Sequence, residues 1–384
     1  MSKRSFGAIA GLAAAGLLLA ACGGSGGDAA SSSAAPTSAA PESSSAEPAP
    51  EPVAAKVGVI LPDAASSARW ETADRPFLEQ AFQAAGVEYD IQNANGDKAK
   101  FATIADQMLA SGINVLMLVN LDSPSAAAVI AKADAQGVPT IDYDRLTLGG
   151  GAQYYVSFDN VAVGTKIGEG LVTCMQNNGN DAGPVVLLNG SPTDNNATLF
   201  KEGYEKVITD AGYTVAADQS VPDWDNTKAG TIFEQIYTEV GGDLIGVASA
   251  NDGLGGAAIA VLERNGVAGE IPVTGQDATD EGLQRVLLGT QCMTVYKAIK
   301  AEAEAASALA VALAKGEIPT ADGLATGSVV DSETGNTVKA VLLEPVSVFP
   351  ENVKDVIADG FTTYDRVCTT DELKKKCEEY GITP

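Results

Sequence analysis

The feature that most constrains this chain is a repeated alternation of short apolar strands with helical patterns. In the first half, the expected strands cover 56–61, 87–91, 114–119, 138–142 and 154–158, and the expected helices cover 69–85, 99–110 and 123–136. Strands separated by helices of this length are typical of βαβ units and a parallel sheet. The first half therefore predicts one doubly wound parallel sheet.

The same alternation then repeats along the second half of the chain. The expected strands cover 184–189, 214–219, 244–248, 271–275 and 291–296, and the expected helices cover 161–175, 195–210, 226–240, 253–265 and 280–288. An Ala- and Glu-rich helix at 297–315, a β-hairpin at 328–346 and a helix at 351–358 follow. We therefore predict an α/β protein with two doubly wound parallel-sheet domains. Asp159-Asn160, a good N-cap pair after the strand at 154–158, marks the predicted crossing between them.

Polar side chains follow nearly every predicted strand at its carboxyl end. Asp144-Arg145 follows one strand, and Asn251-Asp252 and Gln276-Asp277 follow two others. Ligands of open parallel sheets bind in the crevice beyond these strand ends. Taken singly, each residue also fits a helix N-cap, a solvated loop charge or, for Asp144-Arg145, a surface ion pair; Asp194 and Asp252 are good N-cap candidates. The recurrence favours a ligand site.

The mixture of residue types indicates the class of ligand. Carboxylates, amides and cations can each bind two neighbouring hydroxyl groups, and the two tryptophans of the chain, Trp70 and Trp224, offer rings to C–H faces. A phosphate would instead require several cations and a glycine-rich loop. The pattern favours a neutral sugar.

Composition excludes several other functions. The net charge is −26 and no basic cluster follows Arg4, which argues against nucleic acid and anionic membrane surfaces. The chain has no histidine, which excludes Ser-His-Asp and Cys-His catalysis and most catalytic zinc sites. No GxGxxG turn or P-loop occurs. We expect no metal and no cofactor.

The amino-terminal segment resembles a bacterial lipoprotein signal. Lys3 and Arg4 precede an apolar run that ends in Leu19-Ala20-Ala21-Cys22, a sequence that resembles a lipobox. By this resemblance residues 1–21 are removed and Cys22 carries lipid; the alternative is an uncleaved anchor helix. Residues 22–55, which are rich in Ser, Ala, Pro, Gly and Glu, are predicted to be a disordered tether.

Four cysteines remain after Cys22, and an even number in an exported chain suggests two disulfides. Three pairings are possible. Cys368 and Cys377 lie close together around a short polar helix, which favours their pairing and leaves Cys174 with Cys292.

Several motifs resemble those of the periplasmic sugar-binding proteins of ABC importers, and in particular the D-xylose-binding branch of the ribose/galactose-binding group. The motifs are Arg69-Trp70, Tyr143-Asp144-Arg145, Ser157-Phe158-Asp159-Asn160, Gly190-Ser191-Pro192-Thr193-Asp194-Asn195-Asn196-Ala197, Ala250-Asn251-Asp252, Gly275-Gln276-Asp277-Ala278 and Met293-Thr294-Val295-Tyr296-Lys297. The resemblance extends from Lys56 to about Phe361. The first loop, 63–67, and the loop around Trp224 depart from it, which leaves the identity of the sugar open.

The resemblance implies the site and the domains. The implied sugar contacts and their neighbours are Arg69, Trp70, Asp144, Arg145, Asp194, Asn196, Trp224, Asn251, Asp277 and Lys297. Asp144 is expected to compensate the charge of buried Arg145. The N-terminal lobe would comprise 56–158 plus 297–343 and the C-terminal lobe 159–296 plus 344–384, joined by a three-crossing hinge of the type I periplasmic binding protein fold.

The implied function is that of a monomeric, lipid-anchored solute-binding protein outside the cytoplasm, periplasmic or on the cell surface. It would close on a monosaccharide, such as a xylose-like aldose, and present it to an ABC transporter permease. Two alternatives remain. One is an extracytoplasmic sugar-acting enzyme that uses Asp144 and Asp277. The other is a sugar sensor that presents its closed form to a receptor.

Overall fold

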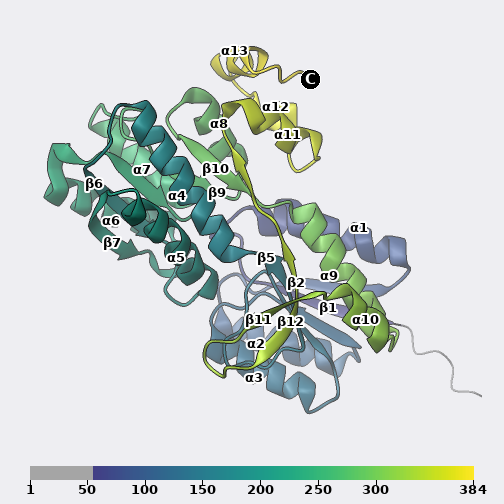
Figure 1. The fold of residues 1–384 in the computed structure, drawn as a ribbon. Coiled ribbons are helices and arrows are strands. Elements are labelled where there is room, and N and C mark those ends of the chain that lie inside the picture. The colour runs from purple at the N-terminus through teal and green to yellow at the C-terminus, as the bar shows by residue number, and fades with distance from the viewer. Residues whose placement is uncertain (1–54) are drawn as a thin grey trace, which may run out of the picture. The chain divides into compact units, whose positions relative to one another are not determined.

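The structure, a computed structural model, describes residues 55–384 (Figure 1). The predicted signal peptide, Cys22 and nearly all of the predicted tether lie outside this range. No helix within residues 55–384 has both the length and the apolar character needed to cross a membrane.

Seven strands form one sheet in the order β11-β12-β5-β4-β3-β1-β2. They are β1 (Lys56–Leu61), β2 (Glu88–Asn93), β3 (Val115–Leu118), β4 (Thr140–Tyr143), β5 (Tyr154–Phe158), β11 (Gly327–Val330) and β12 (Thr337–Leu343). All neighbours pair in parallel except β11, which is antiparallel to β12. The predicted parallel sheet of the first half is confirmed.

Helices cover both faces of this sheet. Side chains alternate along a strand, so Val57 and Val59 of β1 join one buried cluster while Ile60 joins another. The first cluster includes residues of α1 (Arg75–Ala85) and α9 (Ile299–Ala314), and the second includes residues of α2 (Lys98–Ala110) and α3 (Ser123–Asp134). The sheet is therefore doubly wound, as predicted. A further helix, α10 (Ile318–Leu324), was not predicted.

The second half of the chain forms two three-stranded sheets, in the orders β7-β6-β8 and β13-β10-β9. Their strands are β6 (Pro184–Asn189), β7 (Thr214–Ser220), β8 (Gly246–Ser249), β9 (Thr274–Gln276), β10 (Met293–Tyr296) and β13 (Val346–Val348). A parallel bridge between Val247 and Val273 links the two sheets just before β9. Their helices are α4 (Asn160–Asn177), α5 (Asn195–Asp210), α6 (Asn226–Val240), α7 (Asp252–Arg264) and α8 (Asp280–Leu288).

The chain passes three times between the seven-stranded sheet and the other two sheets (Figure 1). It does so between β5 and α4, between β10 and α9, and between β12 and β13. The predicted hairpin is correct in its first part, but its second strand does not continue to Val346. β12 ends at Leu343 beside β5, whereas β13 pairs with β10 in the other sheet. Pro345 lies between them and has no N–H with which to continue the ladder.

Glycines let α4 and α5 pack in direct backbone contact. A Cβ at Gly164 of α4 would collide with the carbonyl oxygen of Phe200 in α5, and a Cβ at Gly203 would collide with the backbone of α4. Since α4 and α5 begin at Asn160 and Asn195, this contact sets the distance between two helix starts that face the candidate site.

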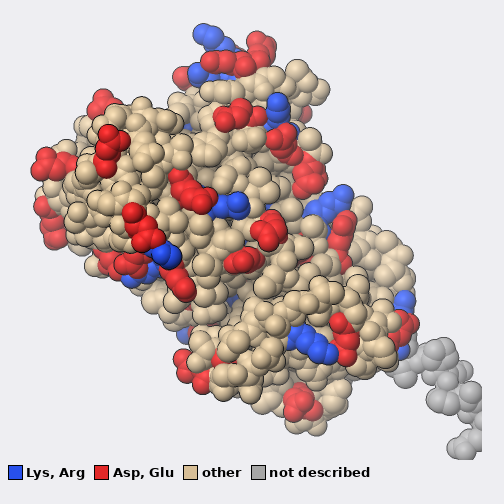
Figure 2. All heavy atoms as spheres, viewed as in Figure 1, with Lys and Arg blue, Asp and Glu red and all other residues tan. Residues whose placement is uncertain are grey.

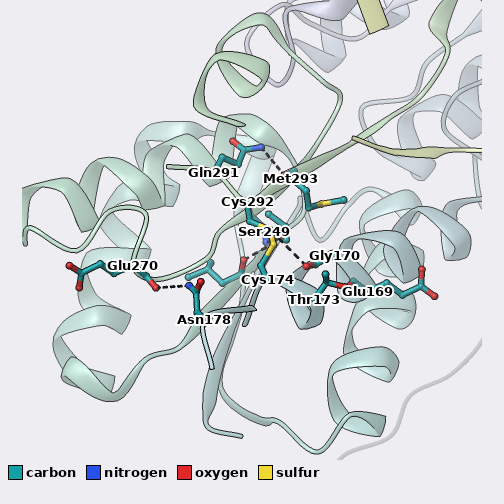
Figure 3. The surroundings of a disulfide bond; sticks show 12 residues. Glu169, Gly170, Thr173, Cys174, Asn178, Ser249, Glu270, Gln291, Cys292 and Met293 are labelled. Carbon is teal, nitrogen blue, oxygen red and sulfur yellow. Dashed lines mark hydrogen bonds between the residues drawn. A yellow bond between two sulfur atoms is a disulfide. The ribbon is translucent and has the colours of Figure 1, made fainter. Parts of the chain in front are cut away.

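Short helices at the carboxyl terminus form a separate buried cluster with α8. They are α11 (Val353–Ala358), α12 (Tyr364–Val367) and α13 (Asp371–Glu379). Cys368 and Cys377 lie within this cluster, 6.3 Å apart between Cα atoms. Cys174 in α4 and Cys292 before β10 are 6.4 Å apart, beside Gly170 and Met293 (Figure 3). Both separations are within the range of disulfides and match the favoured pairing.

Acidic side chains predominate on the surface. Figure 2 shows carboxylates spread over the visible face with fewer lysine and arginine side chains between them. This agrees with 50 acidic against 24 basic residues in the sequence. The candidate site differs because buried cations and carboxylates there are paired.

Candidate functional site

All the side chains implied by the resemblance line one cavity, although they come from loops far apart in the sequence. The lining residues are Ser66, Ser67, Arg69, Trp70, Asp144, Arg145, Asp194, Asn196, Phe200, Trp224, Asn251, Gln276, Asp277 and Lys297. The cavity measures about 30 Å³, which is room for one or two water molecules. The structure thus brings the predicted residues together.

Asp144 is the centre of the site. Its Oδ2 accepts hydrogen bonds from Lys297 Nζ and Arg69 Nη1, each at 3.0 Å, and Asn196 Nδ2 lies 3.2 Å from its Oδ1. Burial favours the neutral acid, but the charges of Lys297, Arg69 and Arg145 outweigh it and hold the pKa of Asp144 below its usual range. Asp144 is therefore a carboxylate that accepts hydrogen bonds.

Arg69 is held by a shell of buried carboxylates. It makes two hydrogen bonds of 2.9 Å to Asp74 and one of 3.1 Å to Glu302. Burial opposes the charge on Arg69, but the carboxylates of Asp74, Asp144 and Glu302 hold the pKa of the guanidinium well above its usual value. Tyr143 donates a hydrogen bond of 2.8 Å to Asp74. Bidentate pairing fixes the guanidinium plane, so Arg69 is oriented before any ligand arrives.

Glu302 is the carboxyl group of this shell with the fewest hydrogen-bond partners. Burial and the nearby Asp144 charge raise the pKa of Glu302 well above its usual value. Its Oε1 is buried and has no hydrogen-bond partner within residues 55–384. Glu302 is therefore the least well compensated carboxyl group of the shell, because Arg69 and Lys297 already face Asp74 and Asp144.

Arg145 pairs with a partner other than the expected one. Its Nε lies 2.9 Å from Asp194 Oδ2, and its Nη1 donates to the carbonyl oxygen of Asn120 at 3.1 Å. The expectation that Asp144 compensates the charge of Arg145 is therefore wrong, because Arg145 forms its ion pair with Asp194. Asp144 has φ of 62°, a left-handed conformation that is uncommon for residues other than glycine. Asp194 also accepts a 3.1 Å hydrogen bond from Trp224 Nε1 and thus links the cation to the indole.

Asn196 connects the start of α5 to the loop after β4. Its Nδ2 donates to the Asp144 carbonyl oxygen at 2.9 Å, and its Oδ1 accepts a 3.0 Å bond from Asn160 Nδ2 at the start of α4. Asp194 caps α5 by accepting from the Asn196 N–H at 2.9 Å, as its N-cap pattern predicts. Asp159 likewise caps α4.

Asn251, not Asp252, caps α7. Asn251 Oδ1 accepts from the Leu254 N–H at 2.9 Å, which corrects the N-cap expectation for Asp252. Asp252 is buried and accepts from Gln291 and Thr279, at 2.7 and 2.9 Å. The cap leaves the Asn251 amide group free to donate to Ser66 O, at 3.3 Å, across the cavity.

The two tryptophans occupy different positions. The guanidinium of Arg69 stacks on the Trp70 ring, with Arg69 Cζ 4.2 Å from the ring centroid. Trp70 Nε1 donates to Ser66 Oγ. Trp224 packs over Gly190, where any Cβ would collide with the indole. Only glycine there lets the Trp224 ring lie against the strand end.

Unusual backbone conformations mark the same region. The non-glycine residues with positive φ among residues 55–384 are Asn95, Asp144, Asp223, Trp224, Asp277 and Ala278. Such residues cost free energy and cluster at functional sites. Asp144, Trp224 and Asp277 line the cavity around Asp144, which we call the central cavity.

The sequence did not single out several residues of the site. Asp74 and Glu302 support Arg69, while Ser66, Ser67 and Phe200 line the cavity. Glu302 lies in a helix rich in Ala and Glu, where its burial is invisible in the pattern. Two serines in a loop carry no signal of their own. Within residues 55–384, no cluster of acidic, cysteine or histidine side chains could hold a metal ion.

Comparisons with known proteins agree with this arrangement. Residues 57–318 match the family model described as periplasmic binding protein domain. The chain is 33% identical over 311 residues to the D-xylose-binding periplasmic protein of Escherichia coli K12, covering 80% of this chain and 90% of that protein. It is 31% identical over 323 residues to the multiple sugar-binding periplasmic protein SbpA of Azospirillum brasilense, covering 79% of this chain and 88% of that protein.

Solved structures show the same fold. An ABC transporter solute-binding protein from Clostridium phytofermentans with bound β-D-glucose has a TM-score of 0.73 and 26% identity, covering 81% of this chain and 99% of that chain. A carbohydrate transporter solute-binding protein from Chloroflexus aurantiacus in complex with D-glucose has a TM-score of 0.72 and 28% identity, covering 81% and 97%. These matches confirm the type I periplasmic binding protein fold and the expectation of a binding protein rather than an enzyme. The chain belongs to the periplasmic binding protein family and is similar to its D-xylose-binding members.

Proposed function

We propose that this protein binds a monosaccharide, a xylose-like aldose, in the cavity around Asp144 and delivers it to an ABC importer. The observation that carries the proposal is the convergence of paired cations, carboxylates, amides and indoles on one cavity. Relatives that bind D-xylose, several sugars or D-glucose support it.

The chemistry of the cavity suits a polyol. Asp144 is an ionised acceptor, while Arg69 and Lys297 are donors held in place by that same carboxylate. Asn196 and Asn251 each offer an amide. Hydroxyl groups both donate and accept, so a sugar can replace the direct contacts among these groups without leaving any of them unpaired.

Binding requires the two walls of the cavity to separate, because about 30 Å³ is far smaller than ligand pockets in general. We propose the lobes 56–158 plus 297–343 and 159–296 plus 344–384, with hinges at the three passages between the sheets. The direct bonds from Asn196 to Asp144 would open, admit the sugar and be replaced by bonds to its hydroxyls. Closure then follows from ligand contacts to both lobes.

The extracytoplasmic location is supported by the periplasmic relatives. We further propose that residues 1–21 are a signal peptide, that Cys22 carries lipid and that the mature protein is a monomer tethered to the membrane. Its partner would be the permease. A receptor that reads the closed form would use the same site, so pull-down of the closed form with its partner distinguishes transport from sensing.

A glycoside hydrolase that uses Asp144 and Asp277 is disfavoured because the two carboxylates belong to different proposed lobes, which move apart, and so make a poor fixed pair. Such enzymes require one carboxyl group with a raised pKa as the general acid. Lys297, Arg69 and Arg145 overcome burial and lower the pKa of Asp144, which excludes Asp144 from that role. Absence of turnover of aryl glycosides would agree with binding alone.

The test of the site is isothermal titration calorimetry with a panel of aldoses. Asp144→Ala leaves Arg69 and Lys297 without their shared carboxylate, and we expect it to weaken sugar binding by about 2–5 kcal/mol. The control is Asp106→Ala, which removes a carboxylate from an exposed ion pair with Lys132. Unchanged affinity of Asp144→Ala would refute the site, and thermal shifts only with amino acids or nucleosides would refute the sugar.

We also propose that the paired cysteines form disulfides, Cys174–Cys292 and Cys368–Cys377. The first joins α4 to the strand β10 across 118 residues of chain. Cys174→Ser should lower the free energy of unfolding by about 2–4 kcal/mol through a less constrained unfolded state. Urea unfolding measures the change, and free thiols in mass spectra of the non-reduced protein would contradict the pairing.

A further inference from the structure

A second cavity adjoins the central one at the mouth of the cleft. It measures about 480 Å³, and three residues line both cavities: Arg145, Asp194 and Trp224. Asp194 accepts from both Arg145 and Trp224, so these three side chains form a wall between the cavities. We call the second cavity the outer cavity. Its volume falls within the range of small-molecule pockets, whereas the central cavity is far smaller.

The loop after β1 leaves this mouth open. Residues 64–68 read Ala-Ala-Ser-Ser-Ala, so this loop contributes no large side chain to the entrance. Ala65 lines the outer cavity on one side of the loop, and Ser67 lines the central cavity. Between the two cavities, Arg145 bonds Asp194, and these residues belong to different proposed lobes. The separation of the lobes that admits a sugar would therefore also open a passage from Asp144 to the outer cavity.

The outer cavity offers hydrogen-bonding groups from widely separated parts of the chain. Its residues are Asp63, Ala65, Asn95, Gly96, Lys98, Leu121, Arg145, Ser191, Thr193, Asp194, Asp223, Trp224, Asp225, Asn226 and Thr227. Amides and hydroxyls suit a second polyol ring. Carboxylates outnumber cations in this set, which disfavours an anionic group such as a uronate or a phosphate.

Strained backbone extends into the outer cavity as well. Asn95 and Asp223 have φ of 56° and 61° and line the outer cavity but not the central one. Trp224, with φ of 56°, lines both. Both cavities are therefore bordered by loops that contain residues with positive φ.

We propose that the cleft accepts a neutral two-ring ligand, a disaccharide or glycoside, with one ring at Asp144 and the second ring in the outer cavity beside Trp224. This inference rests on the proposed sugar-binding function and extends its substrate class. The monosaccharide occupies only the inner part of the same site.

The test compares matched variants on one helix. Thr227 is exposed on α6 and lines the outer cavity, so Thr227→Trp places an indole in it. Thr231 is exposed one turn further along α6 and lines neither cavity. Thr231→Trp therefore makes the same substitution on the same helix outside the site.

Calorimetry measures the binding of aldoses and of neutral disaccharides built from them, such as xylobiose and cellobiose. Wild type and Thr231→Trp are expected to bind the monosaccharide and a disaccharide. Thr227→Trp is expected to lose disaccharide affinity at least tenfold while monosaccharide affinity stays within about twofold, which also shows that the variant is folded.

Three outcomes would overturn the inference alone. The first is a wild type that binds the monosaccharide but no disaccharide, and the second is a Thr227→Trp variant with full disaccharide affinity. The third is loss of monosaccharide affinity in a folded Thr227→Trp variant, because the outer cavity would then hold the first ring. A wild type that binds no sugar overturns the proposed function itself.

Discussion

At the scale of single residues, burial determines what each carboxyl group can do. Asp144 and Asp142 lie two positions apart, yet three cations lower the pKa of Asp144 whereas burial raises the pKa of Asp142 to about 7. Asp142 does not line the cavity and accepts from the N–H and hydroxyl of Thr147, each at 2.7 Å. Of these two neighbouring acids, Asp144 is a charged acceptor in the candidate site, whereas Asp142 holds the backbone and hydroxyl of Thr147.

Asp142 predicts a specific dependence of stability on pH. Its folded pKa is raised from the usual 3.8 to about 7, so its contribution is fully present below about pH 4 and is lost as the pH rises to about 7. Asp142→Asn replaces the carboxyl group with an amide that does not ionise, so the variant should not lose this stability as the pH rises. Urea unfolding at pH 5 and pH 8 should show that the variant gains stability relative to wild type at the higher pH.

The control for this prediction is Asp106→Asn, at an exposed position paired with Lys132. It should follow the wild type at both pH values. An Asp142→Asn variant whose stability relative to wild type is the same at pH 5 and pH 8 would contradict a raised pKa at this position.

At the scale of elements, the contact between α4 and α5 positions the site. Both helices begin at the cavity, where Asn160 of α4 bonds Asn196 of α5 at 3.0 Å. Gly164 permits the close approach of the helices, because a side chain there would strike the backbone of α5. The close packing of α4 against α5 at Gly164 therefore helps to place Asn160 and Asn196 at the cavity.

Two glycine-to-alanine substitutions should act in opposite directions. Gly164→Ala should destabilise the protein by about 1–3 kcal/mol through overpacking. Gly230 lies in α6, and an added Cβ there would meet only Ala257 Cβ at 4.0 Å. Gly230→Ala should stabilise it by up to about 1 kcal/mol through helix propensity.

Thermal and urea unfolding of the two variants measure these changes. Equal stabilities of Gly164→Ala and Gly230→Ala would contradict the close backbone contact between α4 and α5. Gly164→Ala should also weaken sugar binding, since it shifts the start of α5.

At the scale of the whole molecule, the ligand should act as a clamp between the proposed lobes. Saturating sugar should reduce the radius of gyration in small-angle X-ray scattering, because contacts to both lobes favour the closed form. At a concentration of 100 Kd it should also stabilise the protein by about 2.7 kcal/mol. Asp144→Ala at the same sugar concentration should show a smaller gain in stability and a smaller change in the radius of gyration, because weaker binding leaves fewer molecules occupied.

An unchanged radius of gyration with a full gain in stability would indicate binding without hinge closure. That result would preserve the sugar site and reject the proposed lobes. The gain in stability therefore tests the sugar site, and the radius of gyration tests the hinge motion.

The sequence by itself determined the parallel α/β architecture and the placement of polar residues after its strands. Both depend on local patterns, since apolar runs and helix periods specify elements, and polar residues after strands lie at one edge of a sheet. The individual side chains of the site were named by the family resemblance, which did not include Ser66, Ser67 or Phe200. Asp194 was also recognisable as an N-cap, because capping is a local interaction. The family resemblance added the crossing at Leu343–Val346, which the pattern alone read as one continuous strand.

Only the tertiary structure decided how the charges pair. The ion pairs of the site join residues that are separated by up to 233 positions, and no local pattern encodes such contacts. Arg69 pairs with Asp74 and Glu302, and Arg145 pairs with Asp194. Whether Glu302 and Asp142 are buried depends on the helices and loops that pack over them. Burial and partner choice are properties of the packed molecule, and they decide which carboxyl group holds a charge.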